Sequence, residues 1–142
     1  MNVKVLGCHG GESKKHRSTS FLVDDRIAID AGALAGRLSL EEQSRIETVL
    51  VSHPHLDHVR DLAGLVDNRC QQGGAPLEIV GIPDTIATLR THFFNGRLWP
   101  DFTRIPGEDR PTIIFREIEP DVPFVVGGLD VTPVRVNHTI DT

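Results

Sequence analysis

Four potential metal ligands occur within six consecutive residues of this chain: His53, His55, Asp57 and His58. His53 and His55 are two residues apart, so an extended backbone places both imidazoles on one side. Pro54 favours that backbone, because a proline restricts the residue before it to extended conformations. Asp57 and His58 follow at the predicted start of a helix. A strand-to-helix turn can therefore bring all four side chains to one volume.

The chemistry of these side chains indicates a metal site. Imidazole nitrogen and carboxylate oxygen suit Zn²⁺, and also Mn or Fe. An open catalytic ion uses fewer than four protein ligands from so short a segment. The four ligands therefore predict two neighbouring cations. Two cations about 3.5–4 Å apart form a recognised clamp for hydrolysing phosphate esters. A chance cluster is the alternative, since the chain has seven histidines, but a position after a buried strand favours a site.

Strands and helices are both predicted around this cluster. Residues 48–51 form an apolar, β-rich run, which indicates a strand buried on both faces. Residues 59–66 show the apolar spacing of a helix. Further helices are expected after the capping box Ser39–Glu42 and from Pro83 to Phe93. Other strands are predicted at residues 3–7, 21–23, 27–29, 77–80, 112–118, 124–126 and 129–136, with a hairpin joining the second and third and a long loop at 95–110. The class is therefore α/β (α+β).

Composition narrows the range of partners. The formal net charge is −5 and the pI is about 5.7, which argues against a nucleic-acid surface, since such surfaces carry a basic stripe. Cys8 and Cys70 form no CxxC pattern, so no disulfide framework is predicted, and Cys8 is expected to be a small buried side chain. No apolar run approaches the roughly 20 residues of a membrane span, and the first residues do not suggest a signal peptide. We therefore expect a cytoplasmic protein without a membrane partner.

The run Ser-His-Pro-His-Leu-Asp-His at residues 52–58 resembles the HxHxDH signature of the metallo-β-lactamase fold hydrolases. Residues 18–23 and 27–32 look like the early strands of that superfamily. Residues 92–106, which include Asn-Gly-Arg-Leu-Trp-Pro-Asp-Phe, are similar to a stretch typical of class II cyclic-nucleotide phosphodiesterases. The resemblance covers nearly the whole chain. It implies an αββα sandwich of two similar halves, of which mainly the N-terminal half is present.

Carried over residue by residue, the resemblance implies two divalent cations as cofactors, with Zn favoured and Mn or Fe as alternatives. His53 and His55 would bind the first ion, and Asp57 and His58 the second. His138, at the end of a predicted strand, would join the first ion. Asp57 is also the candidate catalytic residue, because it, or a group in the part of the family pattern after His138, could protonate the leaving oxygen.

Other candidate residues have two interpretations each. Asp30, at a predicted strand end, is either a turn residue or a group that orients a ligand histidine by a hydrogen bond. Asn95, Trp99 and Phe102 could line a purine pocket, or they could pack the long loop onto the body of the protein.

Together these features predict a metal-dependent phosphodiesterase that converts 3′,5′-cyclic nucleotides to 5′-nucleotides through a metal-bound hydroxide. An RNA 3′-processing nuclease, a lactonase and a thioesterase are alternatives within the fold, and the acidic pI argues against the nuclease. The family pattern places a bridging aspartate and a last histidine after His138, so residues 1–142 are expected to form a domain truncated after the third histidine motif. An inactive metal-binding fragment is therefore a further alternative. The expected partner is a small cyclic nucleotide or another phosphodiester, and a homodimer remains open.

Overall fold

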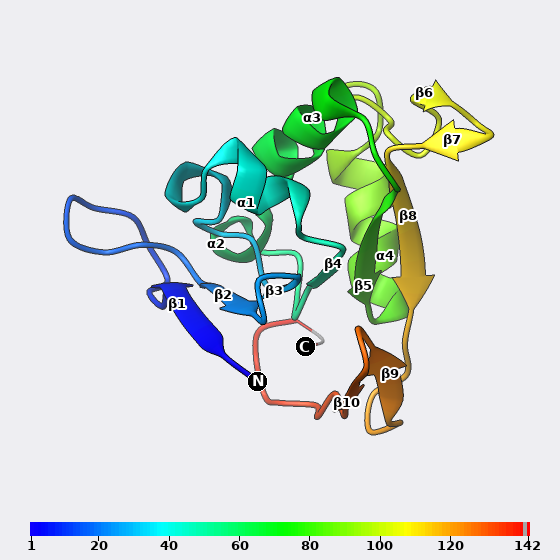
Figure 1. Cartoon of the computed structure of the whole chain (residues 1–142). Helices are drawn as coiled ribbons and strands as arrows, with labels where there is room; N and C mark the ends of the chain where they lie inside the picture. The colour runs from blue at the N-terminus through cyan, green and yellow to red at the C-terminus, as the bar shows by residue number, and fades with distance from the viewer. Residues whose placement is uncertain (141) are drawn as a thin grey trace.

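A six-stranded mixed sheet lies at the centre of the computed structural model, which describes residues 1–140 and 142. The strand order is β1-β2-β3-β4-β5-β8 (Figure 1). The bounds are β1 (Val3–Gly7), β2 (Ser20–Val23), β3 (Ile27–Ile29), β4 (Thr48–Leu50), β5 (Leu77–Gly81) and β8 (Ile113–Glu117). β1, β2 and β3 pair antiparallel, whereas β3, β4, β5 and β8 run parallel. The carboxyl ends of four strands therefore meet at one edge, where ligand sites of α/β proteins form.

Helices cover one face of this sheet. They are η1 (Ala35–Arg37, 3₁₀), α1 (Leu40–Ser44), α2 (Leu56–Val59), α3 (Leu62–Gln72), α4 (Pro83–Thr88) and η2 (Leu89–Phe93, π-helical). Apolar side chains such as Leu65 and Ile86 join Val49 and Ile79 of the central strands in one buried cluster. In the part of the chain that the structure describes, every helix is too short or too polar to cross a bilayer.

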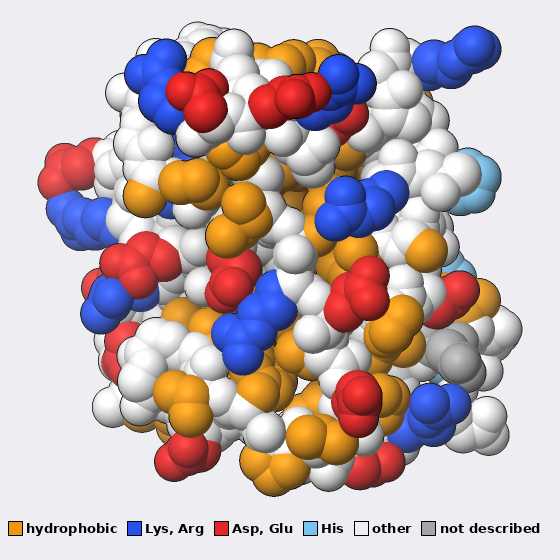
Figure 2. All heavy atoms as spheres, turned by 90° about the vertical axis from the view of Figure 1, so that its right-hand side faces the viewer, with side chains coloured by type: hydrophobic (Ala, Val, Ile, Leu, Met, Phe, Trp, Pro, Cys, Tyr) orange, Lys and Arg blue, Asp and Glu red, His pale blue; other side chains and the backbone are white. Residues whose placement is uncertain are grey.

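The opposite face of the sheet is covered in part by a hairpin of β9 (Phe124–Val126) and β10 (Leu129–Val131). Val23 and Ile27 pack there against Val126. Farther out, Val3 and Val5 of β1 are exposed. Figure 2 shows the side of the molecule that carries β8, where apolar side chains lie among acidic and basic ones. The two faces of the sheet thus differ in how completely they are covered.

Local sequence signals around the first strands are confirmed. β2 and β3 form the expected hairpin, and its turn holds Asp24 and Asp25 at φ of 47° and 59°. Aspartate tolerates this left-handed conformation, which suits a tight hairpin turn. The capping box is also present: the Ser39 hydroxyl accepts from the Glu42 N–H, and the Glu42 carboxylate accepts from the Ser39 N–H. The predicted buried strand is β4, which has parallel neighbours on both sides.

Three predicted elements differ in extent. The helix expected over 59–66 is divided into α2 and α3. The helix expected from Pro83 becomes π-helical at Leu89. The strand expected over 129–136 ends at Val131, because Pro133 lacks the N–H that a strand ladder needs. The long loop also contains a short hairpin of β6 (Pro106–Gly107) and β7 (Arg110–Pro111).

The expectation that Cys8 is buried is wrong, since its side chain is exposed. The pairing of β1 with β2 shifts register between Val5 and Gly7, so Gly7 faces the interior although Val5 is exposed. A Cβ at Gly7 would lie only 2.0 Å from the carbonyl oxygen of Ser18. Cys8 therefore points to the solvent side as the chain leaves β1.

Candidate metal centre

The carboxyl ends of β3 and β4 bring Asp30 beside Ser52. Asp30 directly follows β3, and its backbone N–H donates to the Leu50 carbonyl at 2.8 Å. Its φ of 57° is left-handed, a conformation that aspartate adopts more readily than most residues. The chain turns there so that Oδ1 of Asp30 accepts from the backbone N–H of Ser52 at 2.9 Å. Two neighbouring parallel strands thus join residues that are distant in sequence.

Three histidines converge at this edge of the sheet. Nε2 of His53 lies 3.0 Å from Nδ1 of His55 and 3.1 Å from Nε2 of His138. One ring nitrogen from each lies within 4.8 Å of the others. Three nitrogens on a tetrahedral zinc, with Zn–N bonds of about 2.0–2.1 Å, would be about 3.3–3.4 Å apart. The donor set and its spacing therefore fit a divalent cation, and the three residues are those that the family resemblance implied for the first ion.

The environment keeps His53 neutral. Burial lowers its pKa to about 4, and the neighbouring His58, His55 and His138 act in the same direction. The residue is only 4% exposed. Because a metal binds the neutral imidazole, His53 is in the binding form at physiological pH.

Asp57 and His58 form a second pair of donors beside the first three. Nδ1 of His58 lies 2.7 Å from Oδ2 of Asp30, and this hydrogen bond is the largest cause of the raised pKa of His58. Nε2 of His58 lies 3.4 Å from Oδ2 of Asp57. A carboxylate bound to one imidazole nitrogen fixes the tautomer and leaves the other nitrogen for a metal. The pair offers one nitrogen and one oxygen, two of the ligands that a second cation needs.

Ser52 connects these two groups, and no role was predicted for it from the sequence. Its hydroxyl lies 3.0 and 2.9 Å from the two carboxylate oxygens of Asp30. The same hydroxyl lies 3.0 Å from Nδ1 of His53 and 3.3 Å from Nδ1 of His58. The available signal was its position between a buried strand and the first histidine, on the edge that also carries Asp30.

Gly32 fixes the position of Asp57, a second contribution that the sequence did not reveal. A Cβ at Gly32 would lie 1.8 Å from the backbone carbonyl oxygen of Asp57. Next to it, the N–H of Ala31 donates to the His58 carbonyl at 2.6 Å, and the carbonyl of Ala31 accepts from the Asp61 N–H at 2.7 Å. The segment after β3 therefore packs directly on the backbone of α2, which carries Asp57 and His58.

These side chains line an open cavity of about 370 Å³, formed mainly by residues 52–58 and 136–138. His138 is exposed, and it reaches the cavity from the irregular segment after β10. Gly10 approaches from another side, because a Cβ there would lie 3.6 Å from Oδ2 of Asp57. The cavity leaves room for a ligand larger than a metal ion beside the histidines.

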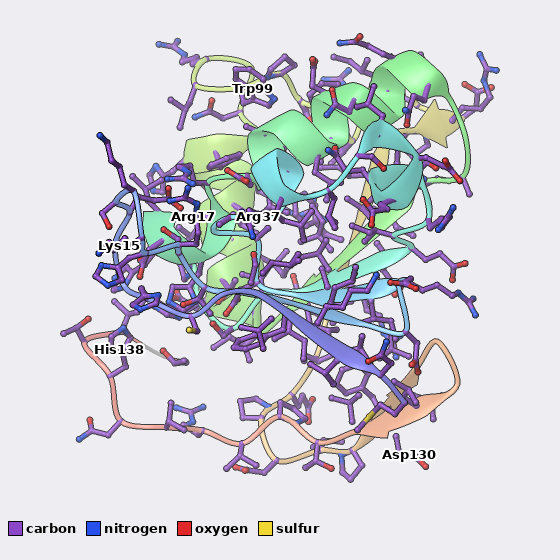
Figure 3. The ribbon with its side chains drawn as sticks, turned by 60° about the vertical axis from the view of Figure 1, so that its left-hand side comes forward. Lys15, Arg17, Arg37, Trp99, Asp130 and His138 are labelled. Carbon is purple, nitrogen blue, oxygen red and sulfur yellow. The ribbon has the colours of Figure 1, made fainter. Side chains whose placement is uncertain are left out.

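The residues predicted for a purine pocket lie elsewhere. Oδ1 of Asn95 accepts from the N–H groups of Arg97 and Leu98, both at 2.9 Å, which closes its own loop. Trp99 packs against the main core, and Phe102 is buried within it. Figure 3 shows Trp99 well apart from His138. The structure does not bring Asn95 and Trp99 to the histidines, and their role in binding substrate stays a prediction.

The architecture resembles that of known metallo-β-lactamase fold proteins. The crystal structure of the metallo-β-lactamase fold protein YhfI from Bacillus subtilis superposes with a TM-score of 0.73 at 21% sequence identity. The superposition covers 98% of this chain and 54% of YhfI. The chain therefore has the metallo-β-lactamase fold, as the sequence predicted.

Sequence comparison gives the family. A family model described as class-II cAMP phosphodiesterases matches residues 33–121. The 3′,5′-cyclic-nucleotide phosphodiesterase of Schizosaccharomyces pombe is 34% identical over 116 residues, which are 80% of this chain and 31% of that protein. The ribonuclease Z of Enterococcus faecalis is 36% identical over 102 residues, which are 62% of this chain and 33% of that protein. The chain belongs to the class-II cAMP phosphodiesterase family, and it spans about a third of the length of these two relatives.

Proposed function

We propose that the full-length protein is a metal-dependent phosphodiesterase that hydrolyses 3′,5′-cyclic nucleotides to 5′-nucleotides. The convergence of His53, His55 and His138 beside Asp57 and His58 is the observation that carries this proposal. Family membership supports a hydrolase. The name of the fission yeast relative supports a cyclic nucleotide as the substrate class.

The donor set suggests how the metals would be held. His53, His55 and His138 would bind one cation, and Asp57 and His58 would contribute to a second. Zn is favoured by the nitrogen-rich set, with Mn or Fe as alternatives. When bound, the cations would supply positive charge to the phosphoryl oxygens and lower the pKa of an attacking water.

The residues of this chain would orient the ligands and move a proton. Asp30 and Ser52 hold the imidazoles of His53 and His58 in fixed orientations. Cleavage of the bond between phosphorus and the 3′ oxygen leaves an alkoxide that must take up a proton. Asp57 borders the cavity, and we assign it to take the proton that the attacking water loses and to pass it to this 3′ oxygen.

Two phosphodiesters test the proposal. The purified full-length protein, loaded with Zn²⁺ or Mn²⁺, is assayed with 3′,5′-cyclic AMP and with bis(4-nitrophenyl) phosphate. We expect release of 5′-AMP, and we expect EDTA to abolish it and added metal to restore it. Turnover of the generic ester without cleavage of any cyclic nucleotide would exclude the proposed substrate class. It would leave the hydrolase assignment in place.

An RNA 3′-processing nuclease is the second candidate, favoured by the identity to ribonuclease Z. The formal net charge of −5 argues against it, because RNA binding gains most of its affinity from basic side chains. Cleavage of a precursor tRNA at a rate comparable to that of cyclic AMP would favour this alternative.

An inactive metal-binding protein is the third candidate. Metal analysis of the purified protein separates it from both enzymes. Two ions per chain would exclude it, whereas one ion or none would support it.

A further inference from the structure

Arg69 of α3 is an arginine with an unusual environment, because its surface is only 9% exposed. Nη2 donates to the carbonyl of Ile46, and Nη1 donates to the carbonyl of Ala75 at 3.3 Å. Nε is buried, and within the described residues it has no hydrogen-bond partner. Two backbone carbonyl groups thus take the place of water as hydrogen-bond acceptors for this buried guanidinium.

The charge of Arg69 lacks an anionic partner. None of the ion pairs among the described residues includes it. Burial lowers its pKa, and the acid that acts against this effect is Glu47. Glu47, however, is engaged by Arg26 through two hydrogen bonds of 3.0 and 2.6 Å. A buried charge is normally compensated by an opposite charge. A bound anion would therefore offset the free-energy cost of burying the positive charge of Arg69.

A cavity of about 100 Å³ lies next to this guanidinium. Its walls come from the end of α3 and from the β6–β7 hairpin, and they include Arg69, Cys70, Gly74 and Arg110. The lining contains two arginines and no acidic residue. A Cβ at Gly74 would lie 3.6 Å from Nη1 of Arg69, so the glycine leaves that side of the guanidinium open.

We propose that this cavity binds inorganic phosphate between Arg69 and Arg110. The planar guanidinium matches the oxygen geometry of phosphate and binds it with strong, charge-assisted hydrogen bonds. The volume suits one tetrahedral anion, because pockets for organic ligands measure roughly 300–1,000 Å³.

The phosphate site is separate from the candidate metal centre. The cavity lies at the amino ends of β5 and β8, whereas the histidines lie at the carboxyl ends of the parallel strands. Figure 1 shows the β6–β7 hairpin and the C-terminal segment at opposite ends of the molecule. An anion here is therefore distinct from the phosphoryl group that would react.

Cys70 provides a local reporter for the experiment, because it lines the cavity. Residues 1–142 contain two cysteines; Cys8→Ser removes the exposed one, and modification of Cys70 is read from its own peptide by mass spectrometry. The rate at which N-ethylmaleimide modifies Cys70 is measured as inorganic phosphate is added. We expect the rate to fall and then saturate, while sodium chloride at the same ionic strength leaves it unchanged. Phosphate bound at the histidines does not reach this thiol, so the readout is independent of the proposed enzymatic activity.

Three variants decide the assignment. Arg110→Gln removes one exposed cation, and Arg69→Lys keeps the charge but loses the planar fork. Each should raise the phosphate concentration that halves the modification rate by about tenfold or more, because each variant loses a charge-assisted hydrogen bond to the anion. Arg97→Gln, which changes an exposed arginine outside the cavity, should leave it unchanged. The proposal would be overturned if the rate of Cys70 modification did not change with phosphate concentration. It would also be overturned if the same phosphate concentration halved the modification rate in Arg110→Gln and in the protein with Arg110.

Discussion

The hydroxyl of Ser52 lies 2.9 Å from Oδ2 of Asp30, and it also contacts Nδ1 of both His53 and His58. His53 and His58 belong to different ligand groups, one for each proposed cation. A single hydroxyl therefore ties the orientation of both groups to one buried carboxylate. Partners that orient metal ligands in this way influence affinity strongly although they do not touch the metal.

Replacing Ser52 should weaken metal binding. Ser52→Ala is expected to lower the Zn²⁺ affinity by about 10- to 100-fold, because His53 and His58 lose their common partner. Ser52→Thr keeps the hydroxyl and should retain most of the affinity. Competition with a chromophoric chelator measures the change. Ser44→Ala is the matched control, since its hydroxyl bonds only locally on the exposed surface of α1. Equal affinity in Ser52→Ala and the wild type would contradict the role assigned to this hydroxyl.

Asp30→Asn should lower the pKa of His58 in the metal-free protein, because the bond to Asp30 is the main cause of its rise. A raised folded-state pKa stabilises the protein below the unfolded value of about 6.5, and this contribution is lost as pH rises through the folded value. The difference in unfolding free energy between wild type and variant should therefore shrink at alkaline pH. NMR titration of His58 and urea unfolding at several pH values measure both effects.

Asp25→Asn is the control for that experiment, because Asp25 is also an aspartate at positive φ. It lies in the β2–β3 turn, away from the histidines, and its replacement should leave the pKa of His58 unchanged. If His58 titrates at the same pH in Asp30→Asn as in the wild type, the bond to Asp30 does not control its charge.

Metal binding should stabilise the fold through His138. Zn²⁺ at about a hundred times its dissociation constant should raise the unfolding free energy by about 2.7 kcal/mol. His138→Ala and His55→Ala should lose most of this gain, because each removes one of three clustered nitrogens. His92→Ala changes an exposed histidine of η2 and should behave as the wild type. Thermal unfolding with and without EDTA tests these expectations, and full stabilisation of His138→Ala would exclude this residue as a ligand.

Gly32→Ala should destabilise the protein by about 1–3 kcal/mol or more, since its Cβ has no space beside the Asp57 carbonyl. The backbone of α2 would have to shift, and metal affinity should fall with stability. Gly36→Ala is the comparison, because a Cβ there meets no atom within 4 Å. It should change the unfolding free energy by less than about 0.5 kcal/mol. Similar urea midpoints for both variants would show that the close approach at Gly32 is unimportant.

Much of the site could be predicted because its ligands are local in sequence. The spacing of His53, His55, Asp57 and His58 contains most of the geometry, since one strand-to-helix turn places all four. His138 needed the family resemblance, because nothing in its neighbourhood distinguishes it from a surface histidine. The fold class followed from the alternation of strands and helices. The end of β10 was missed because the apolar alternation continues beyond Val131 although Pro133 stops the pairing.

The remaining contacts depend on which strands are neighbours. The sequence alone allows two interpretations of Asp30, because it does not show which strands are neighbours. The parallel pairing of β3 with β4 places Asp30 and Ser52 at one edge of the sheet. The burial of Arg69 could not be predicted from the sequence for the same reason, because a basic residue in a helix usually lies on the solvent-exposed face. Its burial arises from packing against Ile46, which precedes β4 and is far away in sequence.

His53 and His138 meet although 85 residues separate them in sequence. Closing a chain loop of that length costs roughly 4 kcal/mol of entropy, whereas the bonds among Asp30, Ser52 and His58 span much shorter stretches. Folding should therefore assemble the Asp30–His58 part of the centre first and dock the segment around His138 late. A cation already held by His53 and His55 would then act as a nucleus for that last step, so the rate of refolding should depend on the metal concentration.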